Sequence, residues 1–103
     1  MIYKERTFTR PNVDIPWHGE ILTTDEHRAY LAKNYTHTGK IVFKEKVVSD
    51  DGLKFTIKYL FDSMESLNEH AADPILIAYI DARKDYNNTM GITESDKIIT
   101  PIE

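Results

Sequence analysis

The sequence predicts an α+β sandwich in which two helices cover one face of a four-stranded antiparallel sheet. Three observations support this prediction. Residues 53–61 alternate apolar and polar side chains, as a half-buried strand does. Thr23 and Asp73 each stand where a helix N-cap is expected, ahead of two helical stretches. Together with the flanking strands, these helices give the order β-α-β-β-α-β.

Composition fits one globular domain over residues 1–103. There is no cysteine, so disulfides, cysteine-ligated zinc and thiol nucleophiles are excluded. The longest apolar run, Ile75–Ile80, is far shorter than the roughly 20 residues that a membrane-spanning helix needs. The N-terminus lacks the apolar segment of a signal peptide, so we expect a cytoplasmic protein with no membrane partner. A net charge of −4 makes a nucleic-acid partner an unfavoured hypothesis.

The first strand is predicted over Ile2–Arg10, and Pro11–Glu20 reads as a loop with two prolines and a glycine. A helix follows. Thr23 with a glutamate three residues later forms a capping box, and Thr24 is a second possible cap. Gly39 supplies the C-terminal stop. The stripe of this helix that we expect to face the sheet consists of His27, Tyr30, Leu31, Asn34, Tyr35 and Thr38.

A hairpin is predicted next, with strands Lys40–Ser49 and Leu53–Phe61. Two registers are possible. A two-residue turn would pair Lys46 with Ile57, whereas a three-residue loop with a left-handed glycine would pair Val47 with Phe55. We prefer the second register because it places apolar residues opposite each other. That register also pairs Phe43 with Tyr59 and Ile41 with Phe61.

The second half of the chain repeats the pattern of helix and strand. Ser63 caps a short helix, and Asp73-Pro74 opens a longer one with a break between the two. Residues 87–91 end that helix, and Ile98–Ile102 form the last strand. We expect this strand at a sheet edge, because Pro101 cannot donate to a ladder. The complete order is that of a ferredoxin-like sandwich.

Glu45 is the first candidate catalytic residue. In the preferred register it lies on the apolar face of its strand, opposite Ile57 and near Phe43. A carboxylate there should have a raised pKa, which suits a general acid or base. The alternatives are a glutamate that reaches solvent near the strand end, or one that pairs with a helix cation.

A polar cleft beside Glu45 is the second expectation. His27, Tyr30 and Asn34 share the helical stripe that should face the sheet, and His70 could point into the same cleft. A hydrogen-bonded interior network, or a rotated helix that exposes His27, would explain the same pattern. The acid–base candidates are Glu45, His27 and His70; the candidate ligand-binding residues are Tyr30, Asn34, Tyr59, Trp17 and His18.

Other site types find no support in the sequence. The histidines have neither each other nor carboxylates at metal spacing, so we predict no metal site. His18 and His37 should be exposed. No glycine-rich phosphate loop or serine-nucleophile motif occurs. A basic patch is expected on the sheet face away from the helices, where an anion could bind; its predicted members are Lys44, Lys46, Lys54 and Lys58, extended by Lys4 and Arg6.

The stretch from Tyr59 to Pro74, YLFDSMESLNEHAADP, resembles the strand–helix segment of the dimeric α/β-barrel superfamily. This superfamily includes antibiotic-biosynthesis-type monooxygenases, EthD-like proteins and stress-responsive barrel proteins. The resemblance extends from Phe55 to Tyr86, and His70 matches a recurrent position. More distantly, residues 8–12 and 82–92 resemble small uncharacterised proteins of marine tailed phages, which would place the protein in the host cytoplasm or the virion.

Membership of the superfamily implies a homodimer with its sheets packed face to face, and a ligand cleft between helices and sheet. Apolar surface at Leu76, Ile77 and Ile80 also favours a partner contact. The haem-degrading branch uses an Asn, a Trp and a His, but Trp17 and His18 are adjacent here, so those roles are not carried over. The quinol-oxidising branch works without a cofactor, and we expect none.

Three functions therefore fit the sequence. The first is a small homo-oligomeric binding or assembly protein, which we prefer because no catalytic motif is specific. The second is a cofactor-independent monooxygenase or a related enzyme acting on a small aromatic ligand. The third is an anion-binding protein that uses the lysine-rich sheet face.

Overall fold

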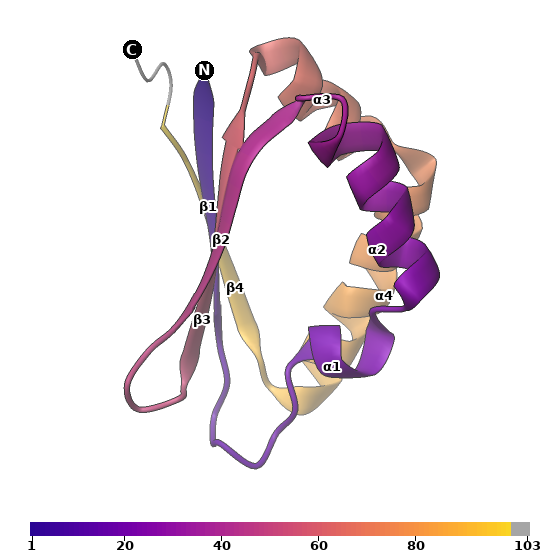
Figure 1. The fold of residues 1–103 in the computed structure, drawn as a ribbon. Helices are drawn as coiled ribbons and strands as arrows, with labels where there is room; N and C mark the ends of the chain where they lie inside the picture. The colour runs from indigo at the N-terminus through magenta and orange to yellow at the C-terminus, as the bar shows by residue number, and fades with distance from the viewer. Residues whose placement is uncertain (100–103) are drawn as a thin grey trace.

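A computed structural model describes residues 1–99 as a four-stranded antiparallel sheet with helices on one face (Figure 1). The strand order is β2-β3-β1-β4, which is the ferredoxin-like order, so the predicted fold class is confirmed. The strands are β1 (Ile2–Thr9), β2 (Ile41–Val48), β3 (Lys54–Phe61) and β4 (Thr93–Ile99). The helices are α1 (His18–Leu22), α2 (Asp25–Leu31), the π-helix η1 (Ala32–Thr36), α3 (Met64–Ala72) and α4 (Pro74–Met90). Within the described range, no helix is both long and apolar enough to cross a bilayer.

The preferred hairpin register was wrong by one residue. Lys46 pairs with Ile57, as in the alternative that we had rejected. The connection is a longer loop, closed where Ser49 N donates to the carbonyl of Lys54 at 2.9 Å and secured by Asp51, whose carboxylate accepts from Ser49 Oγ at 2.6 Å. These loop hydrogen bonds set the register, since a match of apolar side chains alone does not. A bulge between Ile41 and Phe43 restores the expected pairing of Ile41 with Phe61.

The last strand begins earlier than predicted. β4 starts at Thr93, whereas the sequence favoured Ile98–Ile102; of that range, residues 100–102 lie outside the described residues. The segment Thr93–Lys97 is polar and has little strand propensity, but it pairs along β1 from Thr9 to Glu5. Pairing with β1 therefore decides this strand, rather than the preferences of its own residues.

The helix caps largely follow the sequence. Thr24, the second possible cap, accepts from His27 N, and Ser63 accepts from Ser66 N. Asp73 separates α3 from α4, as predicted. The predicted loop over residues 11–20 was wrong at its end, because α1 begins at His18, where the Glu20 carboxylate accepts from the backbone of Trp17 at 2.8 Å.

Asp73 joins α4 to α2 and η1. Its Oδ1 accepts from Ile75 N at 2.9 Å, while Oδ2 accepts from the hydroxyls of Tyr30 at 2.6 Å and Tyr35 at 2.5 Å. Burial opposes ionisation of Asp73, but the hydrogen bonds from the two tyrosines outweigh it and hold its pKa below the ordinary value. One carboxylate thus caps α4 and fixes α2 and η1 against it.

The interior consists of two apolar clusters with polar side chains between them. The first cluster is formed by Ile2, Tyr35, Ile41, Phe61, Leu67 and Leu76. The second is formed by Phe8, Trp17 and Ile92. Along β1 the side chains that face the helices are Ile2, Lys4, Arg6 and Phe8, so two cations lie between the clusters. We call this region the polar middle layer.

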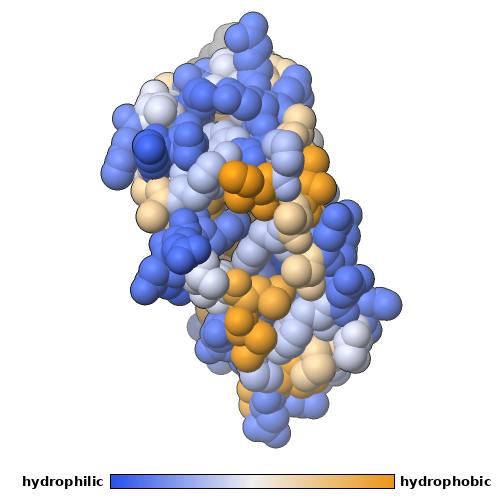
Figure 2. Space-filling view, turned by 90° about the vertical axis from the view of Figure 1, so that its right-hand side faces the viewer, coloured by the Kyte–Doolittle hydropathy of each residue, from blue (hydrophilic) through white to orange (hydrophobic). Residues whose placement is uncertain are grey.

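The buried face of α4 carries polar as well as apolar side chains. Leu76, Arg83 and Asn87 are buried, whereas Ile75 and Ile77 are exposed. Of the three apolar residues predicted to be surplus, Leu76 belongs to the core and Ile77 remains on the surface. Exposed apolar side chains of α1, α3 and α4 form separate patches within a hydrophilic helix side (Figure 2).

We predict that Asp73→Ala lowers the free energy of unfolding by about 2–4 kcal/mol. The substitution removes an N-cap and leaves two tyrosine hydroxyls without their acceptor. Urea unfolding measures the loss. Asp85→Ala, at an exposed position of α4, is the matched control and should change stability little. Equal stabilities of the two variants would contradict the joining role of Asp73.

Candidate functional site

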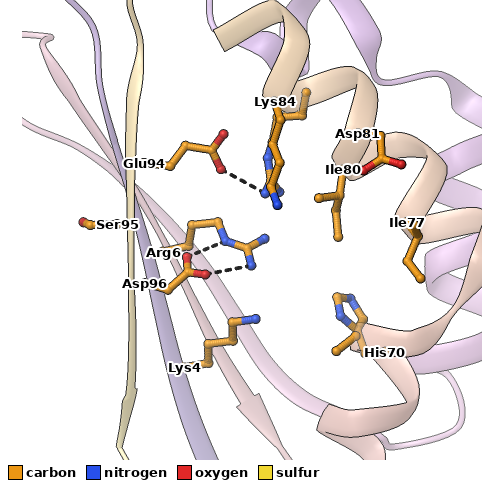
Figure 3. Close-up of a pocket in the computed structure, with 12 residues that line it drawn as sticks. Lys4, Arg6, His70, Ile77, Ile80, Asp81, Lys84, Glu94, Ser95 and Asp96 are labelled. Carbon is orange, nitrogen blue, oxygen red and sulfur yellow. Dashed lines mark hydrogen bonds and ion pairs between the residues drawn. The ribbon is translucent and has the colours of Figure 1, made fainter. Parts of the chain in front are cut away.

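A cavity of about 560 Å³ lies between α3 and α4 on one side and β1 and β4 on the other (Figure 3). It occupies the polar middle layer, and Ile77 and Ile80 form its apolar wall. The charged or titratable side chains that line it are Lys4, Arg6, His70, Asp81, Arg83, Lys84, Glu94 and Asp96. This cavity is the candidate functional site.

Arg6 and Asp96 form the sheet side of the cavity. They are opposite each other in the β1–β4 ladder, and both point toward the helices (Figure 3). Arg6 Nε donates to Asp96 Oδ1 at 2.7 Å and Nη2 donates to Oδ2 at 3.3 Å. A planar guanidinium held at two points keeps a fixed orientation. Asp96 thus balances the charge of Arg6 and accepts hydrogen bonds from two of its nitrogens.

Arg83 reaches the cavity from α4. It is 5% exposed, and its Nη2 lies 2.9 Å from Glu94 Oε1. Asn87, one helical turn further on, donates to Glu94 Oε2 at 3.1 Å. Three buried atoms beside this pair have no hydrogen-bond partner among the described residues: Arg83 Nε, Asn87 Oδ1 and His18 Nδ1. Such buried atoms without a partner each cost free energy.

His70 closes the α3 end of the cavity inside a group of aromatic rings. Its ring centroid lies 5.0 Å from that of Tyr35, 5.4 Å from that of Phe61 and 5.9 Å from that of Tyr59. Burial, followed by the charges of Lys4 and other cations, lowers the pKa of His70 to about 4. At neutral pH the imidazole is therefore uncharged and can accept a hydrogen bond from a ligand.

Lys4 extends from β1 toward His70 (Figure 3). Arg6 and Arg83 each have a carboxylate opposite, whereas no ion pair or hydrogen bond joins the Lys4 ammonium to another described residue. Burial, followed by the charge of Arg6, lowers the pKa of Lys4. The cavity thus contains one half-buried cation without a counter-ion within the described part of the chain.

Glu45 does not lie where the sequence placed it. The observed register pairs it with Lys58 rather than with Ile57, so it is exposed on the sheet face away from the helices. The one-residue slip of the hairpin moved every side chain of β2 beyond the bulge to the opposite face. Glu45 is therefore outside the cavity, and no cleft forms between it and His27.

The other predicted candidates on the first helix contribute mainly to packing. His27 stacks on Tyr79 with ring centroids 4.2 Å apart, and Asn34 donates to the backbone carbonyl of Tyr30 at 2.9 Å. Tyr30 is engaged by Asp73. None of these three predicted residues lines the cavity, so the network alternative describes them better than a ligand cleft does.

Trp17 and His18 are both buried, so the prediction that His18 is exposed was wrong. The ring of Trp17 packs against Phe55 and under the guanidinium of Arg10, while His18 lies against Phe8 at 4.5 Å between ring centroids. Burial, followed by the charge of Arg83, lowers the pKa of His18 to about 4. The short helix α1, which the sequence analysis missed, turns His18 inward.

The predicted lysine-rich outer face was also wrong in its membership. Lys44 and Lys46 pair with Tyr59 and Ile57, so they lie on the helix side together with Lys4 and Arg6. Only Lys54 and Lys58 of the predicted set point outward. The register slip explains the two lysines of β2, and the phase of β1 explains the other two cations.

Sequence reasoning found His70 but missed the other cavity residues. A signal for them exists. Lys4 and Arg6 share the face of β1 that carries Ile2 and Phe8, which is unusual for a buried face. Arg83 and Asn87 continue the helical line of Leu76. Cations that share a strand face or a helix line with core residues indicate that charged side chains lie in the interior.

The described residues contain no group of side chains that could hold a metal ion. Within residues 1–99, no three His, Asp or Glu side chains come together as a metal ion would require. Of the three carboxylates that line the cavity, Glu94 and Asp96 are engaged by arginines and Asp81 is exposed on α4. The arrangement therefore suits hydrogen bonding and charge pairing with an organic ligand.

We predict that the protein loses stability as the pH falls from about 6.5 to 4. His18 and His70 have folded-state pKa values near 4, below the ordinary value, so the unfolded chain binds more protons over this range. For the nearly enclosed His18 the loss is about 2–3 kcal/mol. Unfolding in urea at several pH values measures it. His18→Leu should flatten the dependence, whereas the control His37→Leu, at an exposed position, should not. An unchanged slope in His18→Leu would refute this assignment.

No protein-family model and no curated protein sequence matches the chain. Solved structures do match. SnoaB from Streptomyces nogalater, a cofactor-independent oxygenase, aligns with a TM-score of 0.66 at 13% identity, over 99% of this chain and 93% of its own. The ActVA-Orf6 monooxygenase from Streptomyces coelicolor, solved with nanaomycin D, gives 0.64 at 16% identity, over 99% and 88%.

Rv0793 from Mycobacterium tuberculosis gives a TM-score of 0.60 at 18% identity, over 100% of this chain and 97% of its own. The matches extend over nearly the whole length on both sides, and they confirm at the level of the fold the resemblance found around His70. The chain has the fold of the antibiotic-biosynthesis-monooxygenase-like dimeric α/β-barrel proteins.

Proposed function

We propose that this chain forms a homodimer that binds a small aromatic molecule in the cavity between α3, α4 and the sheet. The observation that carries the proposal is the cavity itself: about 560 Å³ of space inside the sandwich, where cations and a neutral imidazole converge. Ligand sites typically combine an apolar wall with a few placed polar groups. Ile77 and Ile80 supply the wall here, and Lys4, Arg83 and His70 supply the polar groups.

This proposal narrows the binding or assembly role that the sequence favoured. A protein that acts only through its outer surface has no need of charged groups inside its core, where each costs desolvation energy. The lysine-face hypothesis loses its basis, because the predicted lysines are divided between the two faces of the sheet. A phage origin and a cytoplasmic location stay predictions from the sequence.

The outer face of the sheet supports the homodimer. Cross-strand pairing places Phe43, Leu60 and Tyr3 in one apolar row. The next row is charged, with Lys58 between two glutamates, Glu45 and Glu5. No described helix covers this face (Figure 1). A second copy turned by half a revolution could bury both apolar rows and match unlike charges, as isologous interfaces do.

We predict that the protein runs as a dimer in light scattering coupled to gel filtration, and that Phe43→Asp converts it to a monomer. An aspartate in the apolar row would place a carboxylate within the interface. Ile75→Asp on α4 is the matched control, because Ile75 and Phe43 are each 52% exposed. Dissociation by Ile75→Asp alone would place the interface on the helix side. A monomeric wild type would remove the dimer from the proposal.

Cofactor-independent oxygenation is a second candidate function. Two of the similar structures are described as an oxygenase and a monooxygenase. In this chain, Lys4 and the arginines line the cavity and would favour the ionised form of a phenolic hydroxyl, and neutral His70 could accept a hydrogen bond from that hydroxyl. Such an anion is more easily oxidised by dioxygen than the neutral phenol.

We predict that 2-naphthol binds in the cavity and shifts the backbone NMR signals of Lys4, His70 and Asp96. Ile80→Trp should weaken this binding by about tenfold or more, because the larger ring fills the space. Ile75→Trp, outside the cavity, is the control.

The second candidate function is tested by measuring oxygen consumption with 1,4-naphthohydroquinone in an oxygen electrode. It requires that the protein raise oxygen uptake above the rate of spontaneous oxidation. Binding of 2-naphthol without oxygen uptake would support a non-catalytic binding protein. NMR shifts confined to residues outside the cavity would contradict the assignment of the cavity as the binding site.

A further inference from the structure

We propose that Lys4 forms an imine with the carbonyl group of an aromatic aldehyde or ketone that occupies the cavity. This inference rests on the proposed function, because the carbonyl compound would bind in the same cavity, and it adds a covalent activity to that function. Three features of the molecule support it: the position of Lys4, the lack of a carboxylate partner for its amine, and the charges of the groups around it.

Lys4 is placed to meet a ligand. It lies on the helix-facing side of β1, and its side chain extends into the cavity (Figure 3). The residue is half-buried, and the cavity of about 560 Å³ has room for a bicyclic aromatic molecule. Ile77 and Ile80 lie on the α4 wall across from Lys4 and offer apolar surface to the rings of such a molecule (Figure 3).

The amine of Lys4 differs from the two cavity guanidinium groups in its partners. Arg6 Nε lies 2.7 Å from Asp96 Oδ1. Arg83 Nη2 lies 2.9 Å from Glu94 Oε1. Within the described part of the chain, no ion pair includes Lys4. A guanidinium keeps its proton, whereas a half-buried lysine without a carboxylate partner can release one and become a nucleophile.

The groups around Lys4 favour its neutral form. Those that face it are Arg6 on β1, Tyr59 on β3, Glu94 and Asp96 on β4, His70 on α3 and Arg83 on α4, with Asp81 and Lys84 exposed at the rim. Both β4 carboxylates are used by arginines. Burial raises the pKa of Tyr59 and lowers that of His70, so neither carries a charge at neutral pH. Burial, followed by the charge of Arg6, lowers the pKa of Lys4.

The reaction needs only the amine and the carbonyl compound. The nitrogen lone pair of neutral Lys4 bonds to the carbonyl carbon, and the C=O π electrons move to oxygen, which gains a proton as nitrogen loses one. The resulting carbinolamine loses its hydroxyl group and the last N–H proton as water, and the nitrogen lone pair forms the C=N bond. An imine is a weaker base than the amine it replaces, so the product removes the uncompensated positive charge from a desolvated site.

Reductive trapping locates the imine. The protein is incubated at neutral pH with 2-naphthaldehyde and sodium cyanoborohydride, which reduces imines faster than aldehydes. It is then digested with chymotrypsin and analysed by mass spectrometry. Cleavage after Tyr3 separates Lys4 from the N-terminal amine. We expect Lys4 to carry about tenfold more label than the exposed Lys97, because a buried lysine loses its proton more readily.

Lys44 separates the effect of the cavity from that of low basicity. Burial, followed by the charge of Lys46, lowers the pKa of Lys44 to about 8, but Lys44 is on β2 and does not line the cavity. Low basicity alone would direct the label to Lys44, whereas the cavity directs it to Lys4. Ile80→Trp, or an excess of 2-naphthol, should each lower the labelling of Lys4 by about fivefold or more, because either fills the space. Labelling of Lys44 should not change.

A second measurement detects the imine without a reductant. With 2-naphthaldehyde isotope-labelled at its carbonyl carbon, the wild type should show an imine carbon signal by NMR. Lys4→Arg keeps the charge and should lose this signal, whereas the control Lys97→Arg should retain it.

Each other outcome overturns a defined part of the argument. Label confined to Lys44 or to the N-terminal amine, or label at Lys4 that neither Ile80→Trp nor 2-naphthol reduces, would overturn the imine. Binding of 2-naphthol in the cavity without any imine would overturn it while the proposed function stands. Failure of both 2-naphthol and 2-naphthaldehyde to bind would overturn both proposals.

Discussion

The pairing of Arg83 with Glu94 across the middle of the sandwich is the interaction on which the interior depends. A guanidinium that is 5% exposed cannot remain there without a counter-ion, and removal of one partner from a buried pair typically costs about 3–5 kcal/mol. Glu94 also accepts a hydrogen bond from Asn87, so one carboxylate connects two turns of α4 to β4. Arg6 and Asp96 repeat the device between β1 and β4. The first pair holds α4 to the sheet where the two apolar clusters do not meet, the second joins two strands, and both pairs line the cavity. The groups that stabilise the polar middle layer are thus the same groups that give the cavity its chemistry.

The opposite face of the sheet follows from a different constraint. The loop after β2 is fixed by Ser49 and Asp51, and it sets a register in which Phe43 and Val47 point away from the helices. A bulge near Ile41 then returns that residue to the core. β2 therefore presents Phe43 and Val47 outward on either side of Glu45 and presents Lys44 and Lys46 inward, so these two apolar and two basic residues lie on the reverse of the faces usual in a sheet packed on helices. Such an inversion has a physical purpose only if the outer face meets another surface, which is why the homodimer belongs to the proposed function.

The similar structures share the fold over nearly their whole length at 13–18% identity. At that distance the similarity shows the fold alone, so chemistry has to be argued from this chain's own residues. Two of these residues are Lys4 and Arg83. Among the described residues Lys4 is half-buried and has no ion pair, whereas Arg83 is paired with Glu94, and both line the cavity. His70, in contrast, lies in the segment whose pattern first suggested the resemblance, and its neutral state is set by the rings and cations around it.

The sequence by itself determined the fold class, the order of the elements and most of the helix starts, because alternation, caps such as Ser63 and Asp73, and the Asp-Pro break are local signals. It also pointed to His70. It did not determine the hairpin register, since two registers differing by one residue satisfied the same pattern, and with the register it misplaced Glu45 and the lysines of β2. It missed α1 and the first half of β4, whose residues have weak local preferences and depend on contacts with distant segments. Only the tertiary structure showed that Lys4, Arg6 and Arg83 lie inside. A hydropathy pattern assigns cations to the surface, whereas the ion pairs that make the burial of Arg6 and Arg83 possible join residues 90 and 11 positions apart in the chain.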